Sequence, residues 1–433
     1  MKCKTLVVVV CLFLISASAF AQTEQVIGWN ECVKEAKAKH PDLVSAAEKI
    51  DVNLAAKEIT RSAVLPQISG NASEVTTKQA SASSTTITTA ASSKNNRNTV
   101  YQYNLVGQQL LFDGFKTSFD LSTAERNIIA SRYDYNVTSS NIRLNLRTAY
   151  ANLLAAQEYV KVTQEIEARR RQNLELVKLR YEGGREHRGS LLTSEADLAQ
   201  AIYDVNQAKR SVYLAQRQVI KGLGQTKYLP LAATGDLEVK ELVREMPEFE
   251  NIAETTPFLQ QLIAKKEAAR FGVSSAKAQF FPQVYVNGNL GNTNTNAFPD
   301  KNTWSIGTSL SLPIFDGGNI IANLSKAKAT FGQTEADERS GRDSVIVTLA
   351  SAWVTLQNAV DNVGVQKKFL EATRERARIS EAEYSIGLLI YDNWIIIENN
   401  LVSAKKSYVT AQRDALVAEA SWIQAKGGTL DYD

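Results

Sequence analysis

The chain has 433 residues, of which 44% are hydrophobic and 22% are charged. Its 49 lysines and arginines nearly balance its 46 aspartates and glutamates, so charge gives no reason to expect a nucleic-acid partner. Of its three cysteines only Cys32 lies beyond the first 21 residues, and a processed chain is therefore expected to contain no internal disulfide.

The first residues have the order of a secretory signal peptide. Lys2 and Lys4 precede a short apolar run, and Ala19-Phe20-Ala21 supplies the small residues of a cleavage site. We assign residues 1–21 as a signal peptide. Since no later stretch of about 18 apolar residues occurs, no transmembrane helix is expected. An exported chain of this kind is expected to be either a soluble periplasmic protein or an outer-membrane protein.

The rest of the chain reads as two copies of one pattern. Short motifs recur in the same order at constant offsets: Leu65-Pro66-Gln67 with Phe281-Pro282-Gln283, Phe112-Asp113-Gly114 with Phe315-Asp316-Gly317, and Tyr181-x-x-Gly184 with Tyr384-x-x-Gly387. The predicted domains are repeat 1 over residues 22–223, a linker or equatorial insertion over 224–246, repeat 2 over 247–427 and a C-terminal tail over 428–433.

Each repeat is predicted to contain a helix, a β-hairpin, a very long helix and a return helix. The first helices cover residues 29–63 and 247–280, the hairpins 66–113 and 282–315, the long helices 115–182 and 318–385, and the return helices 191–223 and 394–426. At 1.5 Å per residue each long helix is roughly 100 Å long, far beyond an ordinary globular helix. The chain is therefore expected to be mostly α with a small β part.

A strand that leads directly into a long helix is the clearest local pattern. From Trp304 to Leu312 apolar residues alternate with small polar ones, which is the period of a strand with different surroundings on its two faces. Pro313 ends the strand because it has no N–H to donate. Asp316 then stands at the position of a helix N-cap, as does Asp113 in the first copy. The joint residues are Phe112, Asp113, Gly114, Phe315, Asp316 and Gly317.

The long and return helices carry apolar residues at alternating spacings of three and four. In the long helix this pattern includes Ile142, Leu146 and Leu153 in the first copy, and Val345, Leu349 and Leu356 in the second. This narrow stripe is typical of coiled-coil packing. On the helices alone, a plain coiled-coil rod is as good an interpretation as any other.

The strands favour a membrane protein over a rod. One face is predicted to be apolar and lipid-facing, with aromatic residues near the loop end: Tyr101, Tyr103, Leu105, Trp304, Ile306, Leu310 and Leu312. The opposite face carries amides and hydroxyls, as a water-filled lumen requires. Four strands cannot close a barrel, and an open edge in lipid leaves unpaired backbone groups. The chain therefore either spans no membrane or contributes to a barrel shared between copies.

Taken together, these features resemble the TolC family of outer-membrane efflux and secretion channels. The resemblance rests on the signal peptide, the duplicated plan and the paired motifs, and it covers essentially the whole processed chain. It implies a homotrimeric duct in the outer membrane, with a shared 12-stranded β-barrel continued by a long α-helical barrel in the periplasm. It also implies a periplasmic adaptor and an inner-membrane pump of RND or ABC type as partners.

The resemblance places a periplasmic gate at the turns between long and return helices. In the family a tyrosine, a basic residue and ring-forming aspartates hold the second turn shut. Tyr384 and Gly387 match the tyrosine and the turn glycine, but Leu389 falls at the basic position, and Asn393 and Ile396 at the aspartate positions. These departures argue against a cation-binding aspartate ring, and Asp392 is out of register. The candidate gate residues are Tyr181, Gly184, Arg185, Arg188, Tyr384, Gly387, Asp392, Asn393 and Ile396.

No residue pattern suggests an enzyme. His40 and His187 are the only histidines and have no partners at metal-ligand spacing, and no nucleophile–base pair or phosphate loop stands out. We therefore expect no cofactor and no metal. The predicted function is a passive exit duct of a tripartite efflux or type I secretion system. The alternative is a non-transporting trimeric stalk whose strands only anchor it in the outer membrane.

Overall fold

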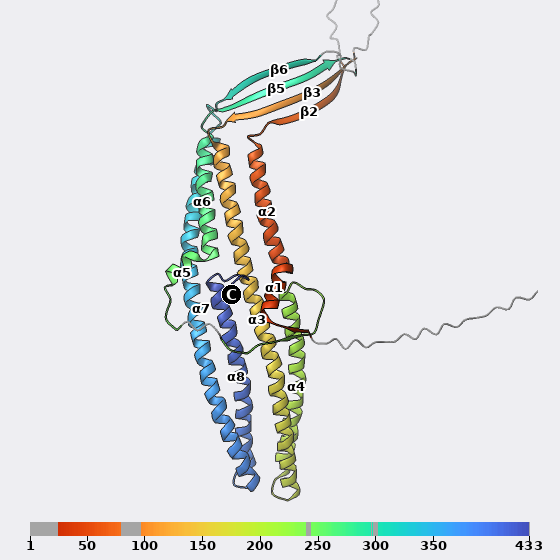
Figure 1. Cartoon of the computed structure of the whole chain (residues 1–433), viewed down its shortest axis with the longest axis vertical. Coiled ribbons are helices and arrows are strands. Elements are labelled where there is room, and N and C mark those ends of the chain that lie inside the picture. The colour runs from red at the N-terminus through yellow and green to blue at the C-terminus, as the bar shows by residue number, and fades with distance from the viewer. Residues whose placement is uncertain (1–24, 79–96, 240–243, 296, 298–301, 433) are drawn as a thin grey trace, which may run out of the picture. The chain divides into compact units, whose positions relative to one another are not determined.

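The computed structural model describes residues 25–78, 97–239, 244–295, 297 and 302–432. The predicted signal peptide and most of the Ser/Thr-rich loop of the first hairpin lie outside these residues. The helices are α1 (Trp29–Lys39), α2 (Pro41–Ser62), α3 (Lys116–Glu182), α4 (Arg188–Gly222), α5 (Phe249–Thr255), α6 (Pro257–Ala278), α7 (Asn319–Ile386) and α8 (Tyr391–Ala425) (Figure 1). The strands are β1 (Gln25–Ile27), β2 (Gln67–Lys78), β3 (Arg97–Phe112), β4 (Leu231–Ala233), β5 (Gln283–Asn294) and β6 (Thr303–Ser311). The predicted mostly helical fold with a small β part is confirmed.

The described chain forms two compact units, and each contains segments of both repeats. The first unit comprises the described residues within 1–38, 148–238 and 363–413, and the second comprises those within 39–147, 239–362 and 414–433. The long helices α3 and α7 each contribute residues to both. Within the described residues no helix is apolar over a length that could cross a membrane.

The first helix of each repeat is broken, whereas the sequence predicted it as continuous. Helix α1 ends at Lys39 and α2 begins at Pro41, and α5 and α6 are divided in the same way before Pro257. Proline is favoured in a first helical turn, and it disfavours helical geometry in the preceding residue. His40 accordingly has an extended backbone and caps α2 by accepting a hydrogen bond from the Asp42 N–H.

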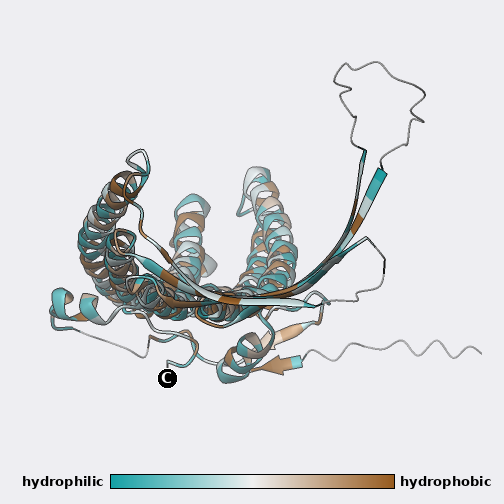
Figure 2. Ribbon diagram, turned by 90° about the horizontal axis from the view of Figure 1, so that it is seen from above, coloured by the Kyte–Doolittle hydropathy of each residue, from teal (hydrophilic) through white to brown (hydrophobic). Residues whose placement is uncertain are grey.

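A four-stranded antiparallel sheet in the order β2-β3-β5-β6 belongs to the second unit. Figure 2 shows it as a strongly curved sheet with alternating hydropathy. The two hairpins meet through β3 and β5, so β2 and β6 are the edges and each pairs on one side only. A register shift between Leu110 and Phe112 bends β3 just before it ends.

Each long helix is preceded, in the joint that follows a strand, by an aspartate three residues before its first helical residue. The Asp113 carboxylate accepts a hydrogen bond from the Thr117 N–H at 2.8 Å, and that of Asp316 accepts one from the Ile320 N–H at 2.8 Å. Both following glycines, Gly114 and Gly317, have positive φ angles near 70°. A side chain at Gly114 would also collide with Phe281, whose Cβ lies 2.5 Å from the position of the added carbon. These contacts explain why Asp-Gly recurs at both joints.

The segment after the first repeat packs as part of the first unit. Strand β4 pairs in parallel with β1, which was not predicted as a strand. The buried Tyr150 hydroxyl on α3 donates to the Thr234 carbonyl at 2.6 Å, and Gln157 accepts from the Ala233 N–H at 3.0 Å. Two α3 side chains thus hold the two-stranded sheet in place.

The predicted apolar stripes form the interior of each unit. Leu349 and Leu356 are fully buried in the second unit, where they pack with Trp422 and Phe249. In the first unit Leu153, Ala201 and Val205 are buried. Because these positions follow the spacing of three and four, the helices pack along narrow seams.

Candidate functional site

The turns α3–α4 and α7–α8 of the first unit end their helices in the same way. Gly184 and Gly387 have positive φ angles of 70° and 87°. The N–H of the following residue, Arg185 or Leu388, bonds to the carbonyl five residues earlier, at 2.8 Å and 2.9 Å. This is a Schellman motif, in which a left-handed residue after the helix is most easily a glycine. Both predicted turn glycines therefore occupy positions that need this backbone conformation.

A cluster of aromatic side chains lies beside these turns. The Tyr384 and Trp394 rings stack with centroids 4.2 Å apart, and Tyr391 contacts both rings edge-on. Tyr384 and Trp394 are completely buried, together with Val177 of α3. We call Val177, Arg180, Glu186, Tyr384, Tyr391 and Trp394 the turn cluster. It joins the first repeat to the second.

Tyr384 is the centre of the polar contacts in the turn cluster. Its hydroxyl donates to the Glu186 carboxylate at 2.9 Å. The Arg180 guanidinium donates to the Tyr384 carbonyl at 2.6 Å and lies over the ring, 4.5 Å from its centroid. Glu186 also accepts from the Ser190 hydroxyl at 2.9 Å. Hydrogen bonds to charged groups are stronger than neutral ones, so these contacts resist separation of the two turns.

Burial keeps the cluster phenols neutral. It is the main cause that raises the pKa of Tyr384, with the Glu186 carboxylate adding to it. Burial and then Asp197 raise the pKa of Tyr391 from 10.0 to about 12. A pKa that is higher in the folded state stabilises the fold below the unfolded value, and this stabilisation is lost as the pH rises.

We therefore predict that the turn cluster loosens between about pH 10 and 12. As the pH is raised, a fraction of the tyrosines should ionise only at high pH, as measured by tyrosinate absorbance. The helical circular dichroism signal should be lost over the same pH range. Tyr391→Phe removes one ionisable group and should move that late loss of helix to higher pH. A helix signal that is unchanged in Tyr391→Phe would contradict this assignment.

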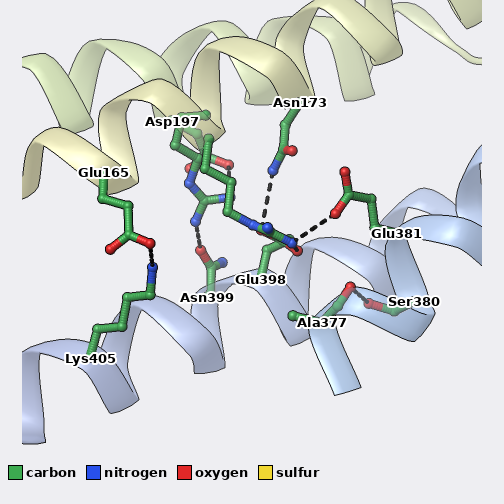
Figure 3. A network of polar contacts seen from close by, with 11 residues as sticks. Glu165, Asn173, Asp197, Ala377, Ser380, Glu381, Glu398, Asn399 and Lys405 are labelled. Atoms are coloured by element: carbon green, nitrogen blue, oxygen red, sulfur yellow. Dashed lines mark hydrogen bonds and ion pairs between the residues drawn. The ribbon is translucent and has the colours of Figure 1, made fainter. Parts of the chain in front are cut away.

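A second set of polar contacts lies further along the same four helices (Figure 3). The Glu398 side chain of α8 is 1% exposed and receives two hydrogen bonds from Arg169 of α3, at 2.6 Å and 2.7 Å. Asn173 donates to the same carboxylate at 3.3 Å, and Arg169 also reaches Glu381 of α7 at 3.1 Å. Glu398 and its neighbour Glu381 raise the pKa of Arg169 against the effect of burial. The Arg169 charge is thus matched by carboxylates from two helices.

Neighbouring pairs extend this polar network. Arg170 donates to Asn399, and Lys405 of α8 pairs with Glu165 of α3 at 2.8 Å. The two ion pairs between α3 and α8 have opposite polarity. Helix α3 supplies the cation that pairs with Glu398, but it supplies the anion that pairs with Lys405. Sliding α8 along α3 would therefore bring like charges together, which fixes the register of the two helices.

The structure brings together only some of the predicted gate residues. Tyr384 is at the centre of the turn cluster, whereas six others have exposed side chains: Tyr181, Arg185, Arg188, Asp392, Asn393 and Ile396. Leu389 packs against the cluster, and the basic group at Tyr384 comes from Arg180 of the first repeat instead. Arg180 was missed because its partner Tyr384 is 204 positions away in the other repeat. Trp394 was also missed, although its stacking partner Tyr384 lies in the same repeat.

The sheet register puts the predicted lipid-facing residues that lie within the strands, all but Leu312, on one face. Leu105 lies opposite Leu290, which lies opposite Trp304, and Leu310 lies opposite Val284. Residues directly opposite each other point to the same side of a sheet. In this chain Trp304, Ile306 and Leu310 are 75%, 72% and 69% exposed. The face is thus largely apolar, with Asn292 and Asn294 as polar residues near its loop end, and much of it is exposed in this chain.

The opposite face of the sheet is polar and uncharged within the four strands. It carries amides and hydroxyls from all of them, such as Asn71, Asn104, Asn287 and Ser309. Asn287 donates to the Ser309 hydroxyl at 2.9 Å. Among the described residues no group of histidine, cysteine and acidic side chains is arranged to hold a metal ion.

Comparisons with known proteins agree on one family. The family model described as outer membrane efflux protein matches residues 32–225 and 250–428. The outer membrane efflux protein BepC of Brucella suis is 23% identical over 329 residues, covering 74% of this chain and 70% of BepC. The outer membrane protein TolC of Vibrio cholerae is 23% identical over 418 residues, covering 93% and 91%.

Solved structures show the same fold. A structure of CusC matches with a TM-score of 0.81 at 18% identity, over 92% of this chain and 91% of that one. The CmeC outer membrane channel of Campylobacter jejuni matches with a TM-score of 0.80 at 18% identity, over 93% and 87%. The two units therefore have the fold of outer-membrane channel proteins.

Proposed function

The chain belongs to the outer membrane efflux protein family, and on this basis we propose that it is the outer-membrane exit duct of a tripartite export system. Three copies form a passive conduit, and an inner-membrane pump of RND or ABC type supplies the energy through a periplasmic adaptor. The helical tunnel lies in the periplasm. The chain carries out no catalysis.

The observation that carries this proposal is the open sheet with one apolar face. Edge strands β2 and β6 each have an unpaired side, and unpaired backbone groups in lipid cost several kcal/mol each. Joining β6 of one copy to β2 of the next satisfies both edges. Twelve strands then close a sheet with apolar side chains toward lipid and the uncharged polar face toward the lumen.

Assembly and conductance test the proposal. Extraction in mild detergent should give a trimer by light scattering with no stable folded monomer, since a lone sheet keeps its edges open. The same preparation should form ion-conducting pores in planar bilayers. A folded monomer would contradict the shared sheet. A trimer without conductance would instead favour a stalk that only anchors in the membrane.

We propose that the turn cluster is the gate of this duct. Its contacts hold α7 and α8 against α3 and α4 where both helix pairs turn, and three copies add their effects. Tyr384 is its central residue because it connects Arg180, Glu186 and the aromatic stack. A docking partner that separates the pairs would bind the open state preferentially and shift the population toward it.

Tyr384→Phe should raise single-channel conductance. The substitution keeps the aromatic stack but removes the hydrogen bond to Glu186, worth about 1.5–3 kcal/mol because one partner is charged. Tyr181→Phe is the matched control, since Tyr181 is the equivalent residue of the first repeat and has an exposed side chain. Equal conductance of the two variants would remove Tyr384 from the gate.

A further inference from the structure

Charged residues in the four strands of the sheet all lie on the apolar face. They are Glu74 and Lys78 of β2 and Arg97 of β3. Glu74 lies opposite Tyr101, and Lys78 lies opposite Arg97, so all three share the side that carries Tyr101, Tyr103 and Trp304. Within the strands, this largely apolar face thus carries charge only near the loop end of the first hairpin.

Lys78 and Arg97 form a direct cross-strand pair of like charge. Opposite residues have Cβ atoms about 5 Å apart, and like charges there destabilise the sheet unless an anion joins them. Glu74 is the nearest acidic residue in the two strands and lies four residues away, about 13 Å along β2. The loop between the strands, residues 79–96, contains no acidic residue and one further lysine. At this end of the two described strands, two cations therefore lie side by side with no adjacent carboxylate.

The pair also lies at a suitable depth for lipid headgroups. Arg97 is four residues beyond Tyr101, which is about 13 Å along the strand and about 10 Å along the membrane normal at a typical strand tilt. Aromatic side chains mark the boundary between the apolar band and the headgroups. Lysine and arginine side chains are long enough to reach back toward that boundary while their stems contact the apolar surface.

We propose that Lys78 and Arg97 bind a phosphate group of a lipid in the outer leaflet. The inference rests on the proposed function, because it requires the apolar face to meet lipid. Arginine forms a bidentate contact with one pair of phosphate oxygens, and lysine contacts the same group as a point charge. The apolar surface below, from Tyr103 to Leu105, holds the acyl chains. The bound phosphate relieves the repulsion between the two cations.

Native mass spectrometry of the full trimer tests this site. The probe is lipid A with two phosphates, compared with the same lipid after enzymatic removal of both phosphates. Wild-type protein should retain up to one phosphorylated lipid per chain. Lys78→Gln/Arg97→Gln should weaken that binding on the order of tenfold and bind both lipids equally. Inorganic phosphate alone should not displace the lipid, because it cannot use the apolar surface.

Two controls keep the outcomes distinct. Lys367→Gln/Lys368→Gln removes the same charge from an exposed part of α7 and should bind lipid A as the wild type does. Conductance of Lys78→Gln/Arg97→Gln should be unchanged, because both residues face away from the lumen. Wild-type lipid binding by this variant would overturn the lipid site and leave the duct intact. Failure of the wild-type trimer to conduct would count against the duct itself.

Discussion

Arg169→Leu should lower the free energy of unfolding by about 3–5 kcal/mol per chain and favour the open duct. The Glu398 carboxylate is 1% exposed and receives two of its hydrogen bonds from Arg169. Without that partner a buried charge keeps only the 3.3 Å bond from Asn173. Leaving one member of a buried ion pair unpaired is among the largest single-residue penalties. Denaturant unfolding of the trimer and bilayer conductance measure the two effects.

Arg171→Leu is the matched control. Arg171 makes the same kind of pair with Glu167, at 2.8 Å on the same helix, but its side chain is 64% exposed. An exposed pair contributes at most about 1 kcal/mol, so this variant should behave almost as the wild type does. The double variant Arg169→Leu/Glu398→Leu should recover most of the lost stability, because neither charge then remains buried. Equal losses in Arg169→Leu and Arg171→Leu would contradict the assigned role of Glu398.

Leu310→Arg should prevent insertion of the sheet or slow it severely. Leu310 is six residues from Trp304, about 20 Å along β6 and about 15 Å along the membrane normal after tilt. That depth is near the middle of the apolar band, where an arginine costs about 2–4 kcal/mol per chain. The fraction of heat-resistant trimer in isolated membranes measures the result.

Ser309→Arg places the same charge one residue earlier on the opposite face. Ser309 lies opposite Tyr285 and accepts a hydrogen bond from Asn287, so the new arginine would meet water in the lumen. This variant should insert normally and shift the ion selectivity of the pore toward anions. If both substitutions block insertion equally, the two faces of the sheet have been assigned incorrectly.

Most of the fold could be predicted from sequence patterns that repeat every two to four residues. Alternation from Trp304 to Leu312 and spacing of three and four along α3 and α7 reflect one strand and one helix face, which local sequence encodes directly. Because the sequence is duplicated, each helix and strand could be predicted independently in both repeats. The aspartates at the two joints could be assigned because helix caps act within a few residues.

Contacts between distant segments could not be predicted in this way. Strand β1 has only three residues and exists because β4 and Tyr150 satisfy its backbone, about 200 and 120 positions away. The Arg169–Glu398 pair likewise joins residues that are 229 positions apart. The helix breaks before Pro41 and Pro257 are local features that were also missed. Proline at a first helical position looks the same in sequence whether a new helix begins there or an earlier one continues with a kink.

The unpaired edges of β2 and β6 also have a genetic consequence. If three copies assemble at random and half of them carry a change that disrupts an edge, only about one trimer in eight is built from intact chains alone. Such an allele would suppress the wild-type allele in the same cell. A null allele, which supplies no chain to mix, would be recessive.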